Sequence, residues 1–356
     1  MPEPTLEEKR FAPGCKIKVE GQELPQDVAV DVLDASVGDF VEGSSIFSLT
    51  MNVWTSMGQE YKYIDDNLFK EGAKVEILVG FVDAFESLLI GEVTALEPDF
   101  GDQESPVLRV QGMDLLHRYR RGRRTDSFLK MKDSDIVAKV AARLKLKADI
   151  EDTQVVHEYV MQYNQTDIDF LSERARRINF ELTYDGETLF FREAANDQKE
   201  AVAIDYGLTL KTFAPRLATA KQVSEVVVKG WDCLTKKPIE ATSKSGDLVK
   251  KMGKEKPGPA ASSSAFFDSQ GVITDICVFS QGEAQQIARG KLNDTAIQYI
   301  TGEGTAIGNT DIRAGRIIQL NKLGRRFSGP YYVKSSTHSL DASGYSTRFS
   351  VERNAT

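Results

Sequence analysis

The chain has 356 residues, of which 45 are Lys or Arg and 53 are Asp or Glu, so its formal net charge is −8. An acidic balance argues against bulk electrostatic affinity for nucleic acid or anionic lipid. The length predicts two or three domains, and three cysteines at unrelated spacings (Cys15, Cys233 and Cys277) argue against a disulfide framework and for a reducing compartment.

The N-terminal stretch MPEPTLEEKRFAPG is acidic and has no apolar core of the kind a signal peptide needs. No run approaches the ~18 apolar residues that a membrane helix requires. We therefore expect a chain that is made and assembled in the cytoplasm, without direct membrane insertion.

The first 110 or so residues read as strands. Apolar and polar residues alternate in SIFSLTMNV (45–53), AKVEILV (73–79) and CKIKV (15–19), and this period of two is typical of half-buried antiparallel strands. Many short strands separated by Gly, Pro and Asp predict a barrel or sandwich. We predict a first β-barrel domain over residues 1–124.

The period changes from Lys132 onward. Apolar residues share a helical face in DSDIVAKVAARLKL, where Asp133 or Ser134 is a candidate cap, and a second helix is predicted after Thr166. The sequence RARRIN (174–179) reads as the polar face of that helix. Asp185 and Gly186 predict a tight turn between two strands. Residues 125–196 are therefore predicted to form a helix-rich α/β insert.

Strand patterns return at LTLKTFAP and SEVVVKGWD, and the chain closes with three more strand patterns after a helix that begins at Ser280. Residues 243–270 are poor in large apolar side chains, which predicts a mobile or partner-ordered loop. The stretch GEGTAIG (302–308) reads as a bend. We predict a second β-barrel domain over residues 197–356.

A short repeat links the two β-rich blocks, because VQGMDLL (110–116) and VKGWDCL (228–234) share four residues at matching positions. The predicted fold is α+β and mainly β, with two related antiparallel β-barrel domains and an α/β insert between them.

Catalytic and metal-binding patterns are scarce. The three histidines, His117, His157 and His338, have no metal-ligand spacing, and no Cys-x-x-Cys pair is present. The acidic pairs DSD (133–135) and DID (167–169) lie at predicted helix starts, where they favour the positive helix end. We predict no enzymatic activity, no cofactor and no metal.

Three stretches of the second half resemble one family. VVVKGWDCLTKKPIEA (226–241), FSQGEAQQIARGKL (279–292) and the closing run from Gly302 are similar to the phage late control D family, which includes baseplate hubs of contractile tails and the hub part of VgrG-type spikes. The insert sequence NQTDIDFLSERARRINFELTYDGETLFFRE fits the same family, so the resemblance runs from about Gly14 to Arg353.

The resemblance implies a homotrimer in which each chain contributes two β-barrels, so that three chains imitate sixfold symmetry. The implied function is a structural hub that joins a hexameric inner tube to a separate trimeric spike, beside other baseplate proteins. The chain ends after the last hub strand, so the spike is expected to be another polypeptide. Whether the particle is a phage tail, a tailocin or another injection system stays open.

The basic stretch RYRRGRRTD (118–126) contains five arginines in an otherwise acidic chain. A planar guanidinium suits bidentate pairing with carboxylates of a neighbouring subunit or tube protein, while a solvated turn or contact with nucleic acid are the other interpretations. The candidate interface residues are Arg118, Arg120, Arg121, Arg123 and Arg124. The alternative functions are a cell-wall polysaccharide hydrolase of a tail tip and a nucleic-acid-binding module.

Overall fold

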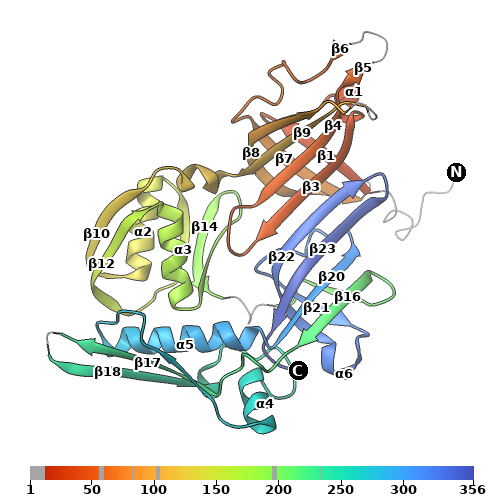
Figure 1. Cartoon of the computed structure of the whole chain (residues 1–356). Helices are drawn as coiled ribbons and strands as arrows, with labels where there is room; N and C mark the ends of the chain where they lie inside the picture. Colours follow the sequence, from red (N-terminus) through yellow and green to blue (C-terminus); the bar gives the residue numbers. More distant parts are fainter. Residues whose placement is uncertain (1–12, 56–59, 82–83, 102–104, 195–198, 234) are drawn as a thin grey trace. The chain divides into compact units, whose positions relative to one another are not determined.

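The computed structural model describes residues 13–55, 60–81, 84–101, 105–194, 199–233 and 235–356 (Figure 1). The chain divides into two compact units. Unit 1 comprises residues 1–117, 305–313 and 335–349, and unit 2 comprises residues 118–304, 314–334 and 350–356. No helix among these described residues is long and apolar enough to cross a membrane.

Unit 1 is built on antiparallel strands. Their order is β20-β23-β22-β3-β4-β9-β8-β7-β1-β2, in which β20 (Ile300–Ile307), β22 (Gly329–Asp341) and β23 (Gly344–Arg353) lie only partly in unit 1. The alternation seen in the sequence is confirmed, because every second residue of β4 and β7 is buried. The elements of its first segment are β1 (Pro13–Val19), β2 (Gln22–Glu23), α1 (Gln26–Ala29), β3 (Val32–Phe40), β4 (Ile46–Asn52), β5 (Trp54–Thr55), β6 (Glu60–Tyr61), β7 (Lys74–Phe81), β8 (Ala84–Asp99) and β9 (Val107–Asp114).

The core of unit 1 forms where these strands turn their apolar faces inward. Leu49 pairs with Val110 across β4 and β9, and both side chains are fully buried. Gly112 is needed beside them, because a Cβ there would lie 2.2 Å from the Phe47 ring and 2.3 Å from the Glu92 carbonyl oxygen. The strand pairings among the described residues form a row whose two ends do not pair with each other. Large antiparallel sheets are therefore established, and closed barrels stay a prediction.

Unit 2 begins with two helices packed on two small sheets (Figure 1). The helices predicted from the sequence are confirmed, and Thr166 Oγ1 accepts a hydrogen bond from the Asp169 N–H at 3.2 Å. The first elements are η2 (Leu115–Arg120, which spans the boundary between units), β10 (Arg124–Lys132), α2 (Asp133–Leu144), β11 (Lys147–Ile150), β12 (Val156–Gln165), α3 (Asp167–Arg177), β13 (Phe180–Tyr184) and β14 (Thr188–Glu193). Strands β10 and β12 form a two-stranded antiparallel ribbon.

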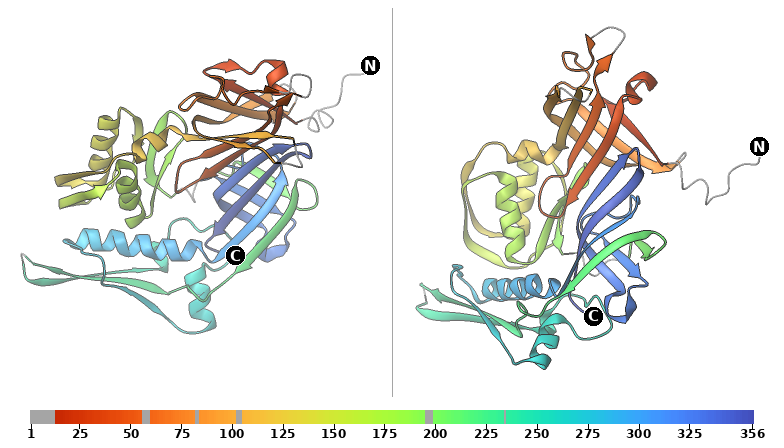
Figure 2. Two further views of the ribbon diagram at one scale, coloured as in Figure 1. Left: turned by 45° about the horizontal axis from the view of Figure 1, so that its top comes forward. Right: turned by 45° about the vertical axis from the view of Figure 1, so that its right-hand side comes forward.

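The rest of unit 2 contains a long helix that lies along a β-hairpin, which Figure 2 shows for α5 and the β17–β18 hairpin. Strands β20, β22 and β23 contribute residues to both units. The elements are β15 (Val202–Asp205), β16 (Leu210–Leu217), β17 (Glu225–Asp232), β18 (Lys237–Lys244), η3 (Ser245–Asp247), α4 (Gly258–Ala265), β19 (Gln270–Ile273), α5 (Gln281–Ile297), β20 (Ile300–Ile307), β21 (Ile317–Asn321), α6 (Gly324–Phe327), β22 (Gly329–Asp341) and β23 (Gly344–Arg353).

Two segments differ from the sequence prediction. Residues 302–307, expected to be a bend, belong to β20, where Gly302 leaves room for the Phe213 ring that a Cβ would approach to 2.7 Å. Residues 243–270, expected to be a mobile loop, contain η3, α4 and the start of β19. Met252 in this segment is buried, and its N–H donates to Asn354 Oδ1 at 2.8 Å.

The repeat lies at the end of a strand in both copies, β9 and β17, and its last residue in the second copy, 234, is outside the described residues. The two strands differ in their neighbours, because β9 pairs with β4 and β8 while β17 pairs with β18 and β19 in a separate three-stranded sheet. The repeat therefore reports a shared local strand ending rather than equivalent positions in two sheets. The predicted division into residues 1–124, 125–196 and 197–356 stays a prediction.

Candidate assembly surfaces

The five candidate arginines lie together at the start of unit 2, in a segment that we call the arginine turn (residues 118–124). Arg118 and Arg120 belong to η2, and Arg124 begins β10. Arg121, Arg123 and Arg124 are exposed. The sequence thus places a dense positive charge at one end of the β10–β12 ribbon.

Part of the arginine turn is held by the start of α3. Arg120 Nη1 lies 2.6 Å from Asp169 Oδ1, and Arg124 Nε lies 3.7 Å from Asp167 Oδ2. Acidic residues in a first helical turn already favour the positive helix end, so these contacts fix the turn against α3. Among the described residues, no hydrogen bond or ion pair involves the guanidinium of Arg121. The predicted interface role of the five arginines stays a prediction.

The outer side of the ribbon carries exposed apolar side chains, and we call this surface the ribbon face. It consists of Leu129, Tyr159, Met161 and Tyr163, which are 65%, 50%, 44% and 70% exposed. Leu129 pairs with Tyr159 across the two strands. This surface was not predicted from the sequence, although the alternation of apolar and polar residues in VHEYVMQYNQ indicates a strand with two different faces.

The inner side of the ribbon packs on the two helices. Phe128 of β10 is buried and stacks on Phe170 of α3, with 5.6 Å between ring centroids. Because α2 and α3 cover this side, the ribbon face is not needed for the core of unit 2. Exposed apolar surface that a fold does not need for its own core marks an interaction site.

A buried ionic network fixes the insert behind the ribbon. Arg174 Nε donates to Asp133 Oδ1 at 2.5 Å, and His157 Nε2 lies 3.0 Å from Asp133 Oδ2. His157 Nδ1 lies 3.6 Å from Glu283 Oε1 of α5. Burial raises the pKa of Asp133, but the hydrogen bond from His157 and the charge of Arg174 outweigh it, so the pKa is lowered overall.

This network corrects two sequence interpretations. Arg174 was expected on a polar helix face but is only 7% exposed, because Asp133 on α2 supplies its counter-charge. Asp133 was a candidate cap, whereas it is the first residue of α2 and Asp135 instead accepts from the Lys132 N–H at 3.2 Å.

The carboxylates that a hydrolase would use are engaged in pairs with basic or amide groups. Asp167 accepts from Arg143 and, at 3.0 Å, from Gln162 Nε2, while Asp133 and Asp169 bind Arg174 and Arg120. Within the described ranges, no group of three or more His, Cys, Asp or Glu is arranged to hold a metal ion.

The three histidines are buried and hydrogen-bonded. His117 Nε2 lies 2.9 Å from Glu92 Oε2 in unit 1, and His157 belongs to the network above. His338 Nδ1 lies 2.8 Å from the Tyr345 hydroxyl. Each of the three rings is therefore engaged in a contact within its own unit.

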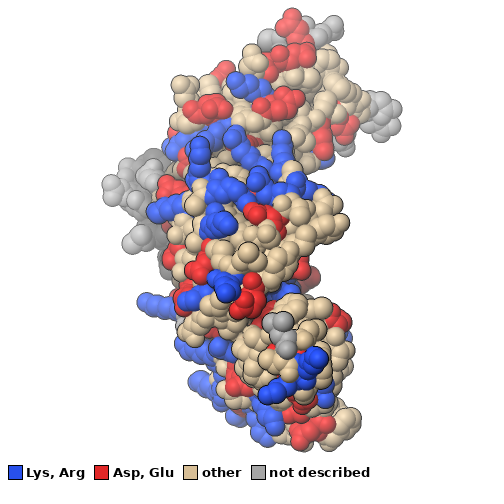
Figure 3. All heavy atoms as spheres, turned by 90° about the vertical axis from the view of Figure 1, so that its left-hand side faces the viewer, with Lys and Arg blue, Asp and Glu red and all other residues tan. Residues whose placement is uncertain are grey.

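The two units carry charge of opposite sign. Unit 1 holds 25 Asp and Glu against 10 Lys and Arg, and unit 2 holds 28 against 35, so their formal charges are −15 and +7 within the total of −8. Basic side chains gather on the face of the molecule shown in Figure 3. The total charge is therefore the sum of two parts of opposite sign.

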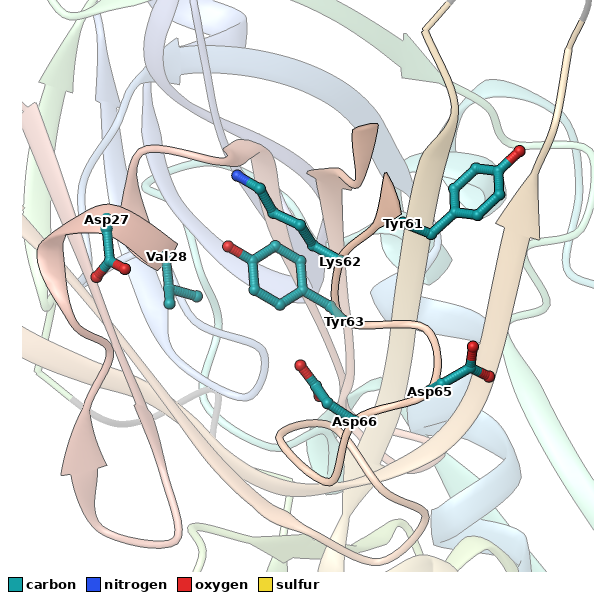
Figure 4. Close-up of a pocket in the computed structure, with 7 residues that line it drawn as sticks. All are labelled: Asp27, Val28, Tyr61, Lys62, Tyr63, Asp65 and Asp66. Carbon is teal, nitrogen blue, oxygen red and sulfur yellow. The ribbon is translucent and has the colours of Figure 1, made fainter. Parts of the chain in front are cut away.

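Unit 1 has an acidic concave surface, which we call the acidic pocket (Figure 4). It encloses about 570 Å³, and its lining residues are Asp27, Val28, Tyr61, Lys62, Tyr63, Asp65 and Asp66. Asp27, Asp65 and Asp66 are exposed. Burial raises the pKa of Asp31 next to the pocket, but hydrogen bonds from Lys62 (2.8 Å) and Tyr63 (2.7 Å) lower it overall.

Aromatic side chains stand beside the acidic pocket. Tyr61 lines the pocket and lies 5.2 Å from both the Trp54 and the Phe100 ring, centroid to centroid. Tyr61 and Phe100 are 51% and 55% exposed. The surface therefore combines exposed carboxylates with exposed aromatic rings beside them.

Comparisons with known proteins identify the fold. The family model described as the Alg8 N-terminal domain matches residues 11–342. The structure is similar to the 43 kDa tail protein of prophage MuSo2 from Shewanella oneidensis (TM-score 0.71, 16% identity, 96% of this chain and 98% of that one). It is also similar to a tail protein from Neisseria meningitidis MC58 (TM-score 0.67, 12% identity, 96% and 97%).

A third similar structure is the E. coli c3393 protein, described as a component of the type VI secretion system that resembles the phage T4 tail proteins gp27 and gp5. Its TM-score is 0.59 at 12% identity, over 96% of this chain and 77% of that one. No curated protein matches the sequence. At these identities the likenesses establish a tail-protein fold along nearly the whole chain.

Proposed function

The chain belongs to the Alg8 N-terminal domain family, and we propose that it is a structural baseplate hub and symmetry adapter. In this proposal it connects the hexameric inner tube to the trimeric spike of a contractile injection system or phage tail. It acts as a homotrimer, binds a separate spike protein and other baseplate proteins, and carries no catalytic activity or cofactor.

One observation supports this proposal above all others: the fold is shared over 96% of the chain with a prophage tail protein, a second tail protein and a type VI secretion component. The similarity of its closing strands and insert to late control D proteins points to the same class. Because fold alone does not specify function, the proposal also needs a physical principle for the task.

That principle is a match of symmetries. In the proposal each chain contributes two related barrels, so three copies around one axis offer six supports to a hexameric tube and three to a spike. In the proposal the β-rich parts close into two related barrels, over residues 1–124 and 197–356, with the insert of residues 125–196 between them. Closed or paired strand edges would also protect the assembly from uncontrolled edge association.

Obligate assemblies of this kind bury large surfaces, typically above ~2,000 Å². The exposed ribbon face and the arginine turn are the parts of unit 2 that an interface would use, because they combine apolar side chains with arginine, a composition enriched at interfaces. Arg118, Arg120, Arg121, Arg123 and Arg124 are accordingly proposed as interface residues.

The test is co-expression of the chain with the tube and spike proteins of its own system, followed by electron microscopy of the purified complex. We expect three copies of the chain between a sixfold and a threefold component. A chain that remains monomeric at micromolar concentration with the spike protein present would refute the hub. Turnover of cell-wall glycan by the purified chain would favour the hydrolase instead.

A further inference from the structure

We infer that the ribbon face and the arginine turn of one copy bind the acidic pocket and its aromatic neighbours on unit 1 of a second copy. This inference rests on the proposed homotrimer and adds the two surfaces that meet in it. The partner is thus another molecule of this chain, joined head to tail.

The ribbon face has the character of an interface centre. Its side chains point away from the helices that fill the other side of the ribbon, and Tyr163, its most exposed member, stands close to the arginine turn because Arg124 pairs with Gln165. An apolar centre with a charged rim is the usual anatomy of a protein–protein interface, where Tyr, Met and Arg are enriched. The ribbon and the turn together supply both parts.

The acidic pocket has the complementary character. Tyr61, which lines it, and Phe100, which contacts Tyr61, offer exposed aromatic rings at its side, and the exposed carboxylates of Asp27, Asp65 and Asp66 give it a charge of opposite sign. Arginines pair well with carboxylates in such settings because the planar guanidinium binds them in bidentate fashion. The two surfaces are therefore opposite in charge, and each carries exposed apolar side chains.

The charges of the whole units favour the same arrangement. A contact between unit 1 of two copies would bring together two bodies of formal charge −15, whereas a contact between unit 1 and unit 2 opposes −15 to +7. Like charges placed together suppress a contact, and opposite charges steer it. The unequal division of charge therefore favours contact between unit 1 of one copy and unit 2 of another over contact between two copies of unit 1.

Ring symmetry requires a contact of this type. A twofold dimer uses one self-complementary patch, while a cyclic trimer needs two different patches that fit each other. This chain carries two such patches on separate units. A tube or spike protein could also supply an acidic surface, and the experiment below separates these partners from a second copy.

The experiment measures the assembly of the purified full-length chain by sedimentation velocity at about 50 mM and about 500 mM NaCl, where screening differs strongly. The variant Arg121→Glu/Arg123→Glu should associate at least about tenfold more weakly than the wild type at low salt. Asp27→Lys/Asp65→Lys should do the same, and the combination of both pairs should restore association. Higher salt should weaken the wild-type trimer.

Matched controls separate this contact from a general charge effect. Lys211→Glu/Lys221→Glu makes the same change of charge at two other exposed sites of unit 2 and should leave the trimer intact. For the apolar part, Tyr163→Ser should weaken association, while Phe267→Ser, which removes a ring that is 74% exposed elsewhere in unit 2, should not.

Each outcome decides one proposal. A wild type that trimerises, with the arginine variant as tightly associated as the lysine control, overturns the inference and leaves the hub standing. Loss of tube binding by the arginine variant with an intact trimer assigns the surface to the tube and also overturns it. A wild type that fails to trimerise even with its spike protein refutes the hub, and the inference with it.

Discussion

Acid should destabilise unit 1 through one buried histidine. His338 on β22 is 2% exposed, and its Nε2 lies 3.1 Å from the Ile312 carbonyl oxygen, which only accepts. Nε2 must therefore carry the hydrogen of the neutral ring, which leaves Nδ1 to accept from the Tyr345 hydroxyl at 2.8 Å. Protonation of Nδ1 would remove that acceptor.

The size of the effect follows from the pKa of His338. Burial, assisted by the positive charge of Arg313 and opposed by Asp39, lowers this pKa from 6.5 to about 4. Below pH 6.5 the His338 ring binds a proton in the unfolded chain. In the folded chain the ring stays neutral until the pH falls to about 4. Stability is thus fully present above pH 6.5 and is lost as the pH falls toward 4, by about 2 kcal/mol at pH 5 and about 3 kcal/mol in all.

The assay is urea unfolding at several pH values, followed by the fluorescence of Trp54 in a Trp231→Phe background, so that the signal reports unit 1. The control is His338→Gln, which keeps a neutral polar side chain without a titration in this range. We expect the wild type to lose about 2 kcal/mol more than the control between pH 7 and pH 5. Equal pH dependence of the two proteins would refute the assignment.

The remaining predictions concern packing and anchoring. Asp133→Ala leaves Arg174 buried without its counter-charge and should cost unit 2 about 3–5 kcal/mol in urea unfolding; no loss would show that the network is not structural. Gly112→Ala should destabilise unit 1 by about 1–3 kcal/mol in the same assay, because the new Cβ would collide with Phe47. Gly101→Ala, where a Cβ meets nothing closer than 4.0 Å, should change the free energy of unfolding little. Asn354→Ala should speed tryptic cleavage within residues 250–256, since its side chain binds the backbone there at 2.8 and 3.2 Å; an unchanged cleavage rate would mean that other contacts hold the segment.

Local patterns in the sequence were sufficient to predict most elements. The alternation in β4 and β7 follows directly from a sheet with one buried face. The start of α3 follows from Thr166, and the β13–β14 turn follows from Asp185, whose carboxylate accepts from the Thr188 N–H at 2.8 Å. Each of these signals lies within a few residues of the structure that it specifies.

The features that escaped prediction depend on partners far away in the chain. Arg174 is buried because of Asp133, 41 residues earlier, and Met252 is held by Asn354, 102 residues later. Composition alone predicted a solvated side chain for Arg174 and a loop around Met252. Burial of a polar group requires a partner, and a single sequence does not reveal which distant residue provides it.

The total charge of the chain is likewise a poor guide to its contacts. A total of −8 describes the molecule from far away, yet an exposed charge acts mainly within a Debye length of about 8–10 Å. At that range a partner responds to the charges of the surface that it approaches rather than to the sum over the whole chain. Contacts of this chain are therefore governed by how its units divide the charge. Residues 1–117 already carry the whole excess of unit 1, because residues 305–313 and 335–349 add two acidic and two basic side chains to it.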